Sequence, residues 1–303
     1  MGTLYHTGER SCSGGDGSGA TPTGSNNGSN NGNAGGLPRF ALLLVCANAA
    51  LYALFMLSDG FRMRAGDGSV GPAATPFPVT EFASECLKYA GICVCLAIAL
   101  LVLRRTPRGT VPHRRDAGHQ VAILAFTLVA DFFLLFGKYF EFANSDWRYE
   151  YLAWTLTIFC VAHAIAIHRY GGGKVMWVML ACAGLGHTPA AKFLISEIPA
   201  LGSQNADYYD ALLSLIVLYA ALIIAATVTA FVRKQARANN LLSRLGMALF
   251  VLCDMNVFLW NAREMGALPD IPAWTYILMW AFYLPAQTML ALSAWDFGRG
   301  RQR

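Results

Sequence analysis

Long apolar segments dominate this chain, and each is about as long as a helix that crosses a bilayer. Such a helix needs roughly 20 predominantly apolar residues. Eight segments of this kind follow one another: 38–57, 83–103, 119–137, 151–168, 174–194, 208–232, 242–262 and 272–295. The fifth is the weakest, because Gly186, His187 and Pro189 interrupt it. The pattern predicts an all-α, polytopic membrane bundle of eight transmembrane helices.

The composition agrees with a membrane protein and excludes several soluble classes. Hydrophobic residues make up 55% of the 303 residues and charged residues only 14%, with a mean hydropathy of +0.42. Soluble domains contain roughly 25% charged residues. The chain is therefore neither a soluble dinucleotide-binding enzyme nor a disulfide scaffold nor a DNA-binding domain. The net charge of +5 does not indicate a nucleic-acid partner, because basic residues in membrane proteins gather in cytosolic loops.

Basic residues also predict the orientation of the helices. With eight alternating spans, sixteen Lys and Arg residues fall on the side of the two termini and six on the other side. The most basic segments, 104–115, 233–244 and 299–303, all lie on the first side. Cytosolic loops carry the excess of Lys and Arg. Both termini are therefore expected in the cytosol.

The ends of the chain differ in composition from its apolar body. Gly, Ser and Asn supply 21 of residues 1–36, a composition that cannot bury a core and predicts disorder. We expect a disordered tail over 1–36, a transmembrane domain over 37–297 and a short basic cytosolic tail over 298–303. Tails of this kind are commoner in eukaryotic proteins, which favours an integral, multi-pass protein of the endoplasmic reticulum or another endomembrane.

Eight cysteines provide no disulfide framework. Six of them lie inside the apolar segments: Cys46, Cys86, Cys93, Cys95, Cys160 and Cys253. We expect them to be small buried hydrophobic residues.

Three ionisable residues lie within the predicted spans at similar depth. Lys88, Asp131 and Asp254 are five, six and eight residues from the non-cytosolic ends of their segments. At 1.5 Å per residue, their depths agree within about 5 Å. Ionisable groups inside a membrane usually face a cavity with a function. The sequence thus predicts one polar layer formed by these three residues.

Further polar groups are expected deeper in the membrane. His163 lies about 12 residues from the non-cytosolic end of its segment, at the level of Tyr283 and Gln287, and Tyr219 is another polar residue in the sixth segment. Such groups are able to position a water molecule or a headgroup. They are equally able to form hydrogen bonds that only hold helices together.

Asp131 and Asp254 are the candidates for chemistry. Two carboxyl groups in one dry cavity do not both ionise readily, so one serves as an acid and the other as a base. The alternative is that each aspartate separately bonds a neighbouring side chain and fixes helix packing.

Three known membrane chemistries do not fit. The last segment has no lysine that could bind retinal, and neither aspartate follows the Gly-x-Gly sequence of intramembrane aspartyl proteases. His163 and His168 point about 140° apart on a helix, which argues against the histidine cluster of a zinc amidohydrolase.

Five short motifs, in order and spacing, resemble the YhhN-like lysoplasmalogenase family of eight-helix membrane proteins. They lie between about Lys88 and Ala294, some two thirds of the chain. The motifs are Leu87-Lys88-Tyr89; Ala130-Asp131-Phe132-Phe133-Leu134-Leu135; Ala162-His163 with a later Tyr170; Phe250-Val251-Leu252-Cys253-Asp254; and Phe282-Tyr283-Leu284-Pro285-Ala286-Gln287.

The chain departs from the family pattern at four positions. Tyr89, Ala130, Cys253 and Phe282 replace a proline, a glycine, a serine and a tyrosine. Ala130 and Cys253 are small, so close helix contacts are preserved. Both aspartates, the lysine, the histidine and the glutamine are intact.

The resemblance implies hydrolysis of the vinyl-ether bond of lysoplasmalogens, which are single-chain ether phospholipids. The products are a fatty aldehyde and a glycerophospho-amine, and no metal or other cofactor is implied. Asp131 and Asp254 are then the catalytic acid–base pair. Lys88 is a candidate to bind the substrate phosphate or one carboxylate, and His163, Tyr283 and Gln287 are candidates to position water or the headgroup.

Two other functions are compatible with the same residues. A transporter or lipid-binding protein could use the polar layer to hold a headgroup or to couple to protons. A structural membrane protein would have no site there.

Overall fold

Seven long α-helices and one short 3₁₀-helix form the part of the chain that is described by the computed structural model. The described residues are 39–65, 81–107, 111–139, 150–178, 181, 206–233, 237–264, 268, 270–272 and 274–295. The helices are α1 (Arg39–Ala65), α2 (Glu81–Arg105), α3 (Val111–Phe136), η1 (Gly137–Tyr139), α4 (Glu150–Arg169), α6 (Ala206–Val232), α7 (Arg237–Glu264) and α8 (Thr275–Leu292). Each α-helix contains a stretch long and apolar enough to cross a membrane. The chain is an all-helical, multi-pass membrane protein.

Part of the prediction falls outside the described residues. The fifth predicted span, 174–194, is described only in part, and residues 173–178 are helical. The tails, 1–36 and 298–303, also lie outside the described residues. Their predicted disorder and the cytosolic orientation of the termini stay predictions.

Several helices are longer than their predicted apolar spans. Helix α3 begins at Val111 instead of 119, and α7 begins at Arg237 instead of 242. Helix α8, in contrast, is shorter than predicted, because it ends at Leu292 instead of 295. The hydropathy pattern marks only the apolar part of a helix, whereas hydrogen bonding continues through polar residues at its ends. Polar groups in those extra turns are consequently part of the bundle.

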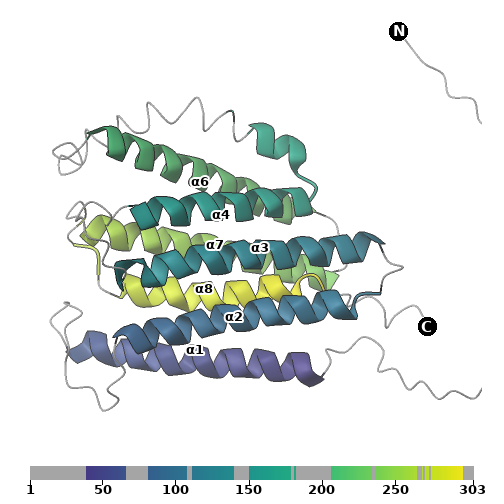
Figure 1. Ribbon diagram of the computed structural model, residues 1–303, viewed down its shortest axis with the longest axis horizontal. Coiled ribbons are helices and arrows are strands. Elements are labelled where there is room, and N and C mark those ends of the chain that lie inside the picture. The colour runs from purple at the N-terminus through teal and green to yellow at the C-terminus, as the bar shows by residue number, and fades with distance from the viewer. Residues whose placement is uncertain are drawn as a thin grey trace, which may run out of the picture. The chain divides into compact units, whose positions relative to one another are not determined.

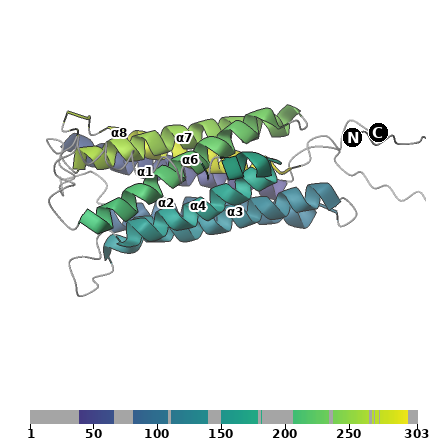
Figure 2. The same ribbon diagram turned by 90° about the horizontal axis from the view of Figure 1, so that it is seen from above.

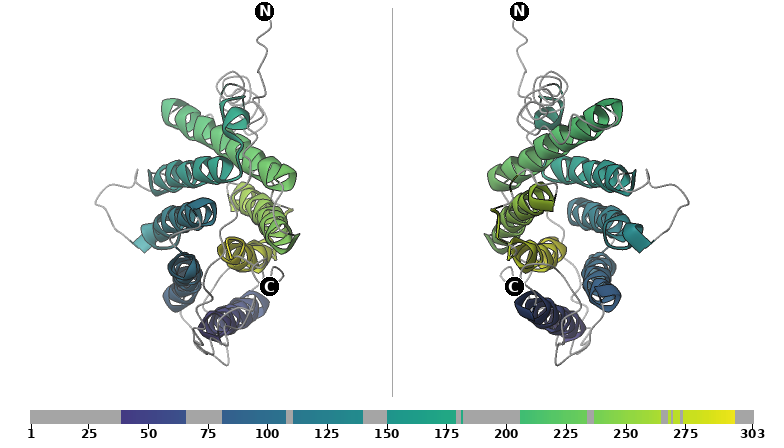
Figure 3. Two further views of the ribbon diagram at one scale, coloured as in Figure 1. Left: turned by 90° about the vertical axis from the view of Figure 1, so that its right-hand side faces the viewer. Right: turned by 90° about the vertical axis from the view of Figure 1, so that its left-hand side faces the viewer.

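The helices run side by side along one direction (Figure 1), and the view from above shows the same alignment (Figure 2). Seen along the helices, α2, α3 and α4 form one row and α8 and α7 form a second (Figure 3). Helix α1 packs on α2 and α8, and α6 packs on α4 and α7. Facing helices α3, α4, α7 and α8 thus enclose the centre of the bundle.

Two glycines allow α8 to approach its neighbours closely. A Cβ atom on Gly91 of α2 would lie 2.9 Å from Leu284 Cδ1, and one on Gly246 of α7 would lie 2.8 Å from Leu290 Cγ. Small residues are typical of helix contacts in membranes, where tight packing replaces the hydrophobic effect between helices. These two glycines allow α8 to pack closely against α2 and α7.

Pro285 interrupts the hydrogen-bond ladder of α8. Proline has no N–H to donate to the carbonyl group four residues earlier, which is that of Ala281. The hydroxyl of Tyr52 on α1 donates a hydrogen bond to this carbonyl oxygen, at 3.4 Å. A neighbouring helix thus satisfies the freed backbone group, as proline in a membrane helix requires.

The outer surface of the bundle is strongly apolar. Large side chains such as Phe40, Leu43 and Leu57 of α1 are more than half exposed, as expected for helices that face lipid. Three cysteines also lie on this surface: Cys46, Cys86 and Cys93. The prediction of buried cysteines is therefore wrong for these three, because hydropathy does not separate a lipid-facing from a core-facing position. It is confirmed for Cys95, Cys160 and Cys253.

Candidate functional site

Asp131 lies inside the bundle and contacts α8. Its side chain is buried, with a relative exposure of 1%, and its Oδ2 atom accepts a hydrogen bond from the hydroxyl of Tyr283. Its other oxygen, Oδ1, is buried without a hydrogen-bond partner among the described residues. This free oxygen is the atom on which the carboxyl group could carry a proton. Two of the predicted site residues are thus in direct contact.

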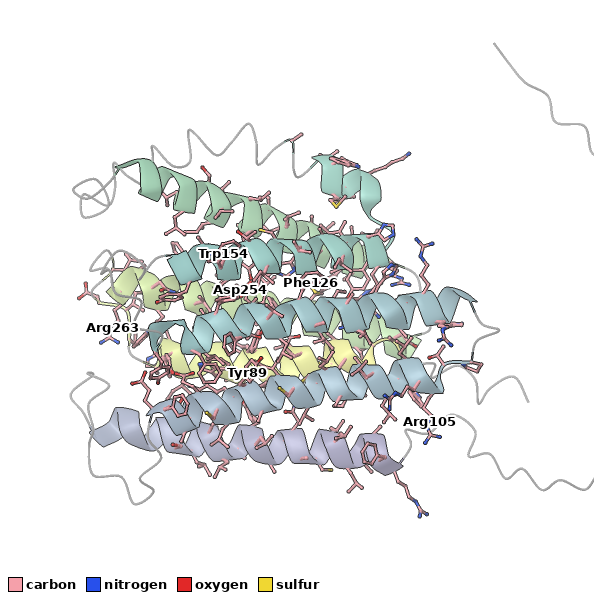
Figure 4. The ribbon with its side chains drawn as sticks, viewed as in Figure 1. Tyr89, Arg105, Phe126, Trp154, Asp254 and Arg263 are labelled. Carbon is pink, nitrogen blue, oxygen red and sulfur yellow. The ribbon has the colours of Figure 1, made fainter. Side chains whose placement is uncertain are left out.

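Asp254 forms a second pair of the same kind. Its Oδ2 atom accepts a hydrogen bond of 2.5 Å from the hydroxyl of Tyr219 on α6. The side chain is only partly buried, and it lies between the bundle end that carries Arg263 and the end that carries Arg105 (Figure 4). In the described part of the chain, neither aspartate forms a salt bridge. Each carboxyl group is therefore held by a neutral tyrosine.

Aromatic contacts connect the two aspartate–tyrosine pairs. The ring centroid of Phe250 lies 5.6 Å from that of Tyr283 and 5.4 Å from that of His163. The His163 ring in turn lies 5.3 Å from that of Tyr219. A chain of ring contacts therefore runs from Tyr283 through Phe250 and His163 to Tyr219. The structure thus brings both predicted catalytic residues, and His163 and Tyr283 with them, into one site.

Gln287 lies on α8, one turn beyond Tyr283. Gln287 and His163 line one small cavity between α3, α4, α7 and α8. Both side chains are buried, and His163 Nε2 and both polar atoms of the Gln287 amide have no hydrogen-bond partner in the described structure. The water- or headgroup-positioning role expected for these two residues stays a prediction.

Lys88 lies in a different cluster from the two aspartates. Its Nζ atom is 2.8 Å from Asp59 Oδ2 of α1 and 3.7 Å from Glu85 Oε2. It also donates a hydrogen bond of 2.7 Å to the hydroxyl of Tyr276 and lies 4.8 Å from the ring centroid of Trp280. Similar depth therefore does not bring Lys88 against the catalytic candidates. Its predicted contact with the substrate phosphate stays a prediction.

A second charged cluster joins α3, α4 and the end of α6. The guanidinium group of Arg169 donates to both carboxylate oxygens of Asp116, with Nη2 2.9 Å from Oδ2. Arg233 Nη1 lies 2.8 Å from the other oxygen of Asp116. Arg169 also donates to Gln120 Oε1 and to the hydroxyl of Tyr170. The sequence reasoning missed this cluster, because it began the helix after Asp116.

A glycine turn at the end of α4 positions Arg169 and Tyr170. Gly171 has a φ of +81°, a conformation that glycine adopts readily. The N–H of Gly172 donates to the carbonyl of Ile167, and that of Gly171 donates to the carbonyl of His168. These two bonds form a Schellman cap. The positive φ of this turn explains the glycine at position 171.

Two functional partners were not predicted as site residues. Tyr219 was noted only as a polar residue in an apolar helix, and its contact with Asp254 was not foreseen. Asp59 lies two residues beyond the predicted end of the first span. A buried lysine needs a counter-charge, and that requirement would have pointed to Asp59. Among the described residues, no group of three or more His, Cys, Asp or Glu side chains could hold a metal ion.

Comparison with known proteins identifies one family. The model of the YhhN family matches residues 87–294, which include both aspartate–tyrosine pairs and the small cavity. Neither the search of curated proteins nor that of solved structures found a match.

Proposed function

The chain belongs to the YhhN family, and on this basis we propose that it is a membrane hydrolase that cleaves the vinyl-ether bond of lysoplasmalogens. The substrate is a single-chain ether phospholipid, and the products are a fatty aldehyde and a glycerophospho-amine. The observation that carries the proposal is the pair of Asp–Tyr contacts, joined through Phe250 and His163 in one site.

The reaction requires an acid and a carboxylate. Transfer of a proton to the outer carbon of the vinyl ether leaves an oxocarbenium ion, and addition of water then forms a hemiacetal. The hemiacetal breaks into an aldehyde and an alcohol, so that one water molecule is consumed. A carboxylic acid is able to give the first proton, and a nearby carboxylate stabilises the cation and takes a proton from the attacking water.

We assign the acid role to Asp131 and the carboxylate role to Asp254. Asp131 is almost completely buried, and an isolated buried charge is costly, so the protonated form suits this environment. Its Oδ1 atom is free to hold the proton. Asp254 is partly exposed and accepts a hydrogen bond from Tyr219, which suits a carboxylate. Tyr283 and Tyr219 then fix the orientation of the two carboxyl groups.

Aldehyde release from a lysoplasmalogen by purified protein in detergent tests the proposal. We expect release by the wild type and a loss of about 10²–10⁴-fold in Asp131→Asn and in Asp254→Asn, the range typical of general acid–base catalysis. Asp270→Asn is the matched control, because Asp270 is exposed and lies outside the site. It should retain full turnover.

A carrier would behave differently in the same preparation. If folded wild-type protein binds the lipid and releases no aldehyde, the hydrolase proposal fails. Lipid flux that follows a pH gradient across liposomes would then support a proton-coupled transporter.

A further inference from the structure

A small cavity lies in the bundle between four helices, two of which, α3 and α7, carry the aspartates. Its volume is about 20 Å³, and residues of α3, α4, α7 and α8 line it. A cavity of about 10–15 Å³ is large enough to hold one water molecule, and that water needs two to four polar partners. The cavity is thus large enough for a single water.

Three buried side chains supply those partners. Gln120 and Gln287 are each 1% exposed and His163 is 5% exposed. Gln120 Nε2, His163 Nε2 and both polar atoms of the Gln287 amide have no hydrogen-bond partner among the described residues. All three residues line the cavity. Buried polar groups of this kind are costly unless something completes their hydrogen bonds.

The lining of the cavity connects two parts of the molecule. Gln120 and Tyr170 line it and also accept hydrogen bonds from Arg169, at the end of the bundle. His163 and Phe250 line it and also form the aromatic connection between the aspartate–tyrosine pairs. Water at this position would lie between the charged end of α4 and the candidate catalytic residues.

We propose that the cavity is a water-binding site and that it supplies the water consumed in the hydrolysis. The second half of this statement rests on the proposed function. The oxygen of that water forms the new bond to the oxocarbenium carbon, and one of its protons passes to Asp254. Breakdown of the hemiacetal releases the aldehyde and the alcohol, and return of a proton from Asp254 to Asp131 restores the starting state.

Radiolytic hydroxyl-radical labelling followed by mass spectrometry tests the first half without any substrate. Radicals formed from bound water oxidise the side chains beside it. Met247 lines the cavity and is only 2% exposed, whereas Met279 is 9% exposed and is not part of the lining. We expect Met247 to be oxidised several times faster than Met279 in the wild type. Equal rates, or a slower rate at Met247, would overturn the site.

Two variants separate binding of water from its use. Ala166→Leu places a larger side chain into the cavity, and Gln287→Met removes the amide while keeping the length of the side chain. Both should reduce labelling of Met247, without reducing that of Met279, and lower aldehyde release by about tenfold or more. Ala230→Leu is the matched control, because Ala230 is buried on α6 and does not line the cavity.

The outcomes distinguish the two proposals. If the variants reduce labelling of Met247 and leave turnover unchanged, the cavity does not supply the water for hydrolysis. The bound water is then only structural. Rapid labelling of Met247 in a wild-type protein that releases no aldehyde would contradict the proposed function while keeping the water site. If Ala166→Leu does not fold, Gln287→Met and the wild-type labelling still decide the result.

Discussion

The Lys88 cluster and the two aspartate–tyrosine pairs hold buried ionisable groups in opposite ways. Lys88 is fully buried and is bound to Asp59 as an ion pair, with Glu85 close by. Asp131 and Asp254 are held by tyrosine hydroxyls and form no salt bridge with any described residue. One region neutralises its charge with an opposite charge, and the other uses only neutral donors.

This difference separates a structural role from a chemical one. A buried ion pair fixes helices in one arrangement, and removing one partner leaves an uncompensated charge. A carboxyl group beside a neutral donor is free to gain or lose a proton without breaking an ion pair. We therefore expect variants of the Lys88 cluster to affect stability first, and variants of the aspartate–tyrosine pairs to affect turnover first.

Lys88→Met should produce the largest loss of stability. It removes the cation that lies against Asp59 and Glu85, and we expect the free energy of unfolding to fall by about 3–5 kcal/mol. Unfolding by sodium dodecyl sulfate in mixed micelles measures this change. The double variant Lys88→Met/Asp59→Leu should recover part of the loss, because it also removes the Asp59 carboxylate and leaves only Glu85 without Lys88. If Lys88→Met is as stable as the wild type, the Lys88 cluster does not have the stabilising role that distinguishes it from the aspartate–tyrosine pairs.

Tyr219→Phe and Tyr283→Phe should affect turnover more than stability. Each variant removes a hydrogen bond to a carboxyl group, worth about 1.5–3 kcal/mol for the charged Asp254 and about 0.5–1.5 kcal/mol for the protonated Asp131. We expect turnover to fall by about one to two orders of magnitude in Tyr219→Phe and by up to about tenfold in Tyr283→Phe. Aldehyde release per folded molecule measures the effect. Tyr89→Phe is the control, because it removes a hydroxyl group and keeps the ring contacts with Phe132 and Phe136. An equal loss of turnover in this control would show that the effect is not specific to the tyrosines that bind the aspartates.

Gly172→Ala should have the smallest effect and should leave the aspartates untouched. An added Cβ atom would lie 2.2 Å from Thr229 Cγ2, so α4 and α6 must separate slightly, at a cost of about 1–3 kcal/mol. Gly173→Ala is the matched control, because nothing lies within 4 Å of its Cβ position. Thermal unfolding of both variants measures the difference. If turnover per folded molecule is lower in Gly172→Ala, the packing of α4 on α6 at Gly172 affects the aspartate–tyrosine pairs.

The sequence predicted the helices better than it predicted the partners of Asp131 and Asp254. Hydropathy gives the depth of a residue along a helix, and similar depth was the reason to group the two aspartates. It does not give the direction in which a side chain points around the helix. Lys88 was therefore grouped with the aspartates, although it faces Asp59 of α1 and the rings of α8.

Polar residues near helix ends were the other source of error. The predicted spans ended at the last apolar residue, so that Asp59 and Asp116 were excluded from the bundle. Both lie in helices and bind cations from neighbouring helices. Their partners, Lys88 and Arg169, are buried charges whose need for a counter-ion can be read from the sequence. The choice among acidic candidates depends on packing, which the sequence alone does not specify.

The Asp59–Lys88 ion pair has a consequence for biosynthesis. A lysine inside a lone membrane helix costs up to about 2.5–3.5 kcal/mol on insertion, the value for the helix centre. Helix α1 precedes α2 in the chain, so the ribosome makes the acidic partner before the basic one. If the two helices enter the bilayer together as a hairpin, the charges of Asp59 and Lys88 are already matched. Helix α1, which lies outside the family match at residues 87–294, thus carries the counter-charge of a lysine within that match.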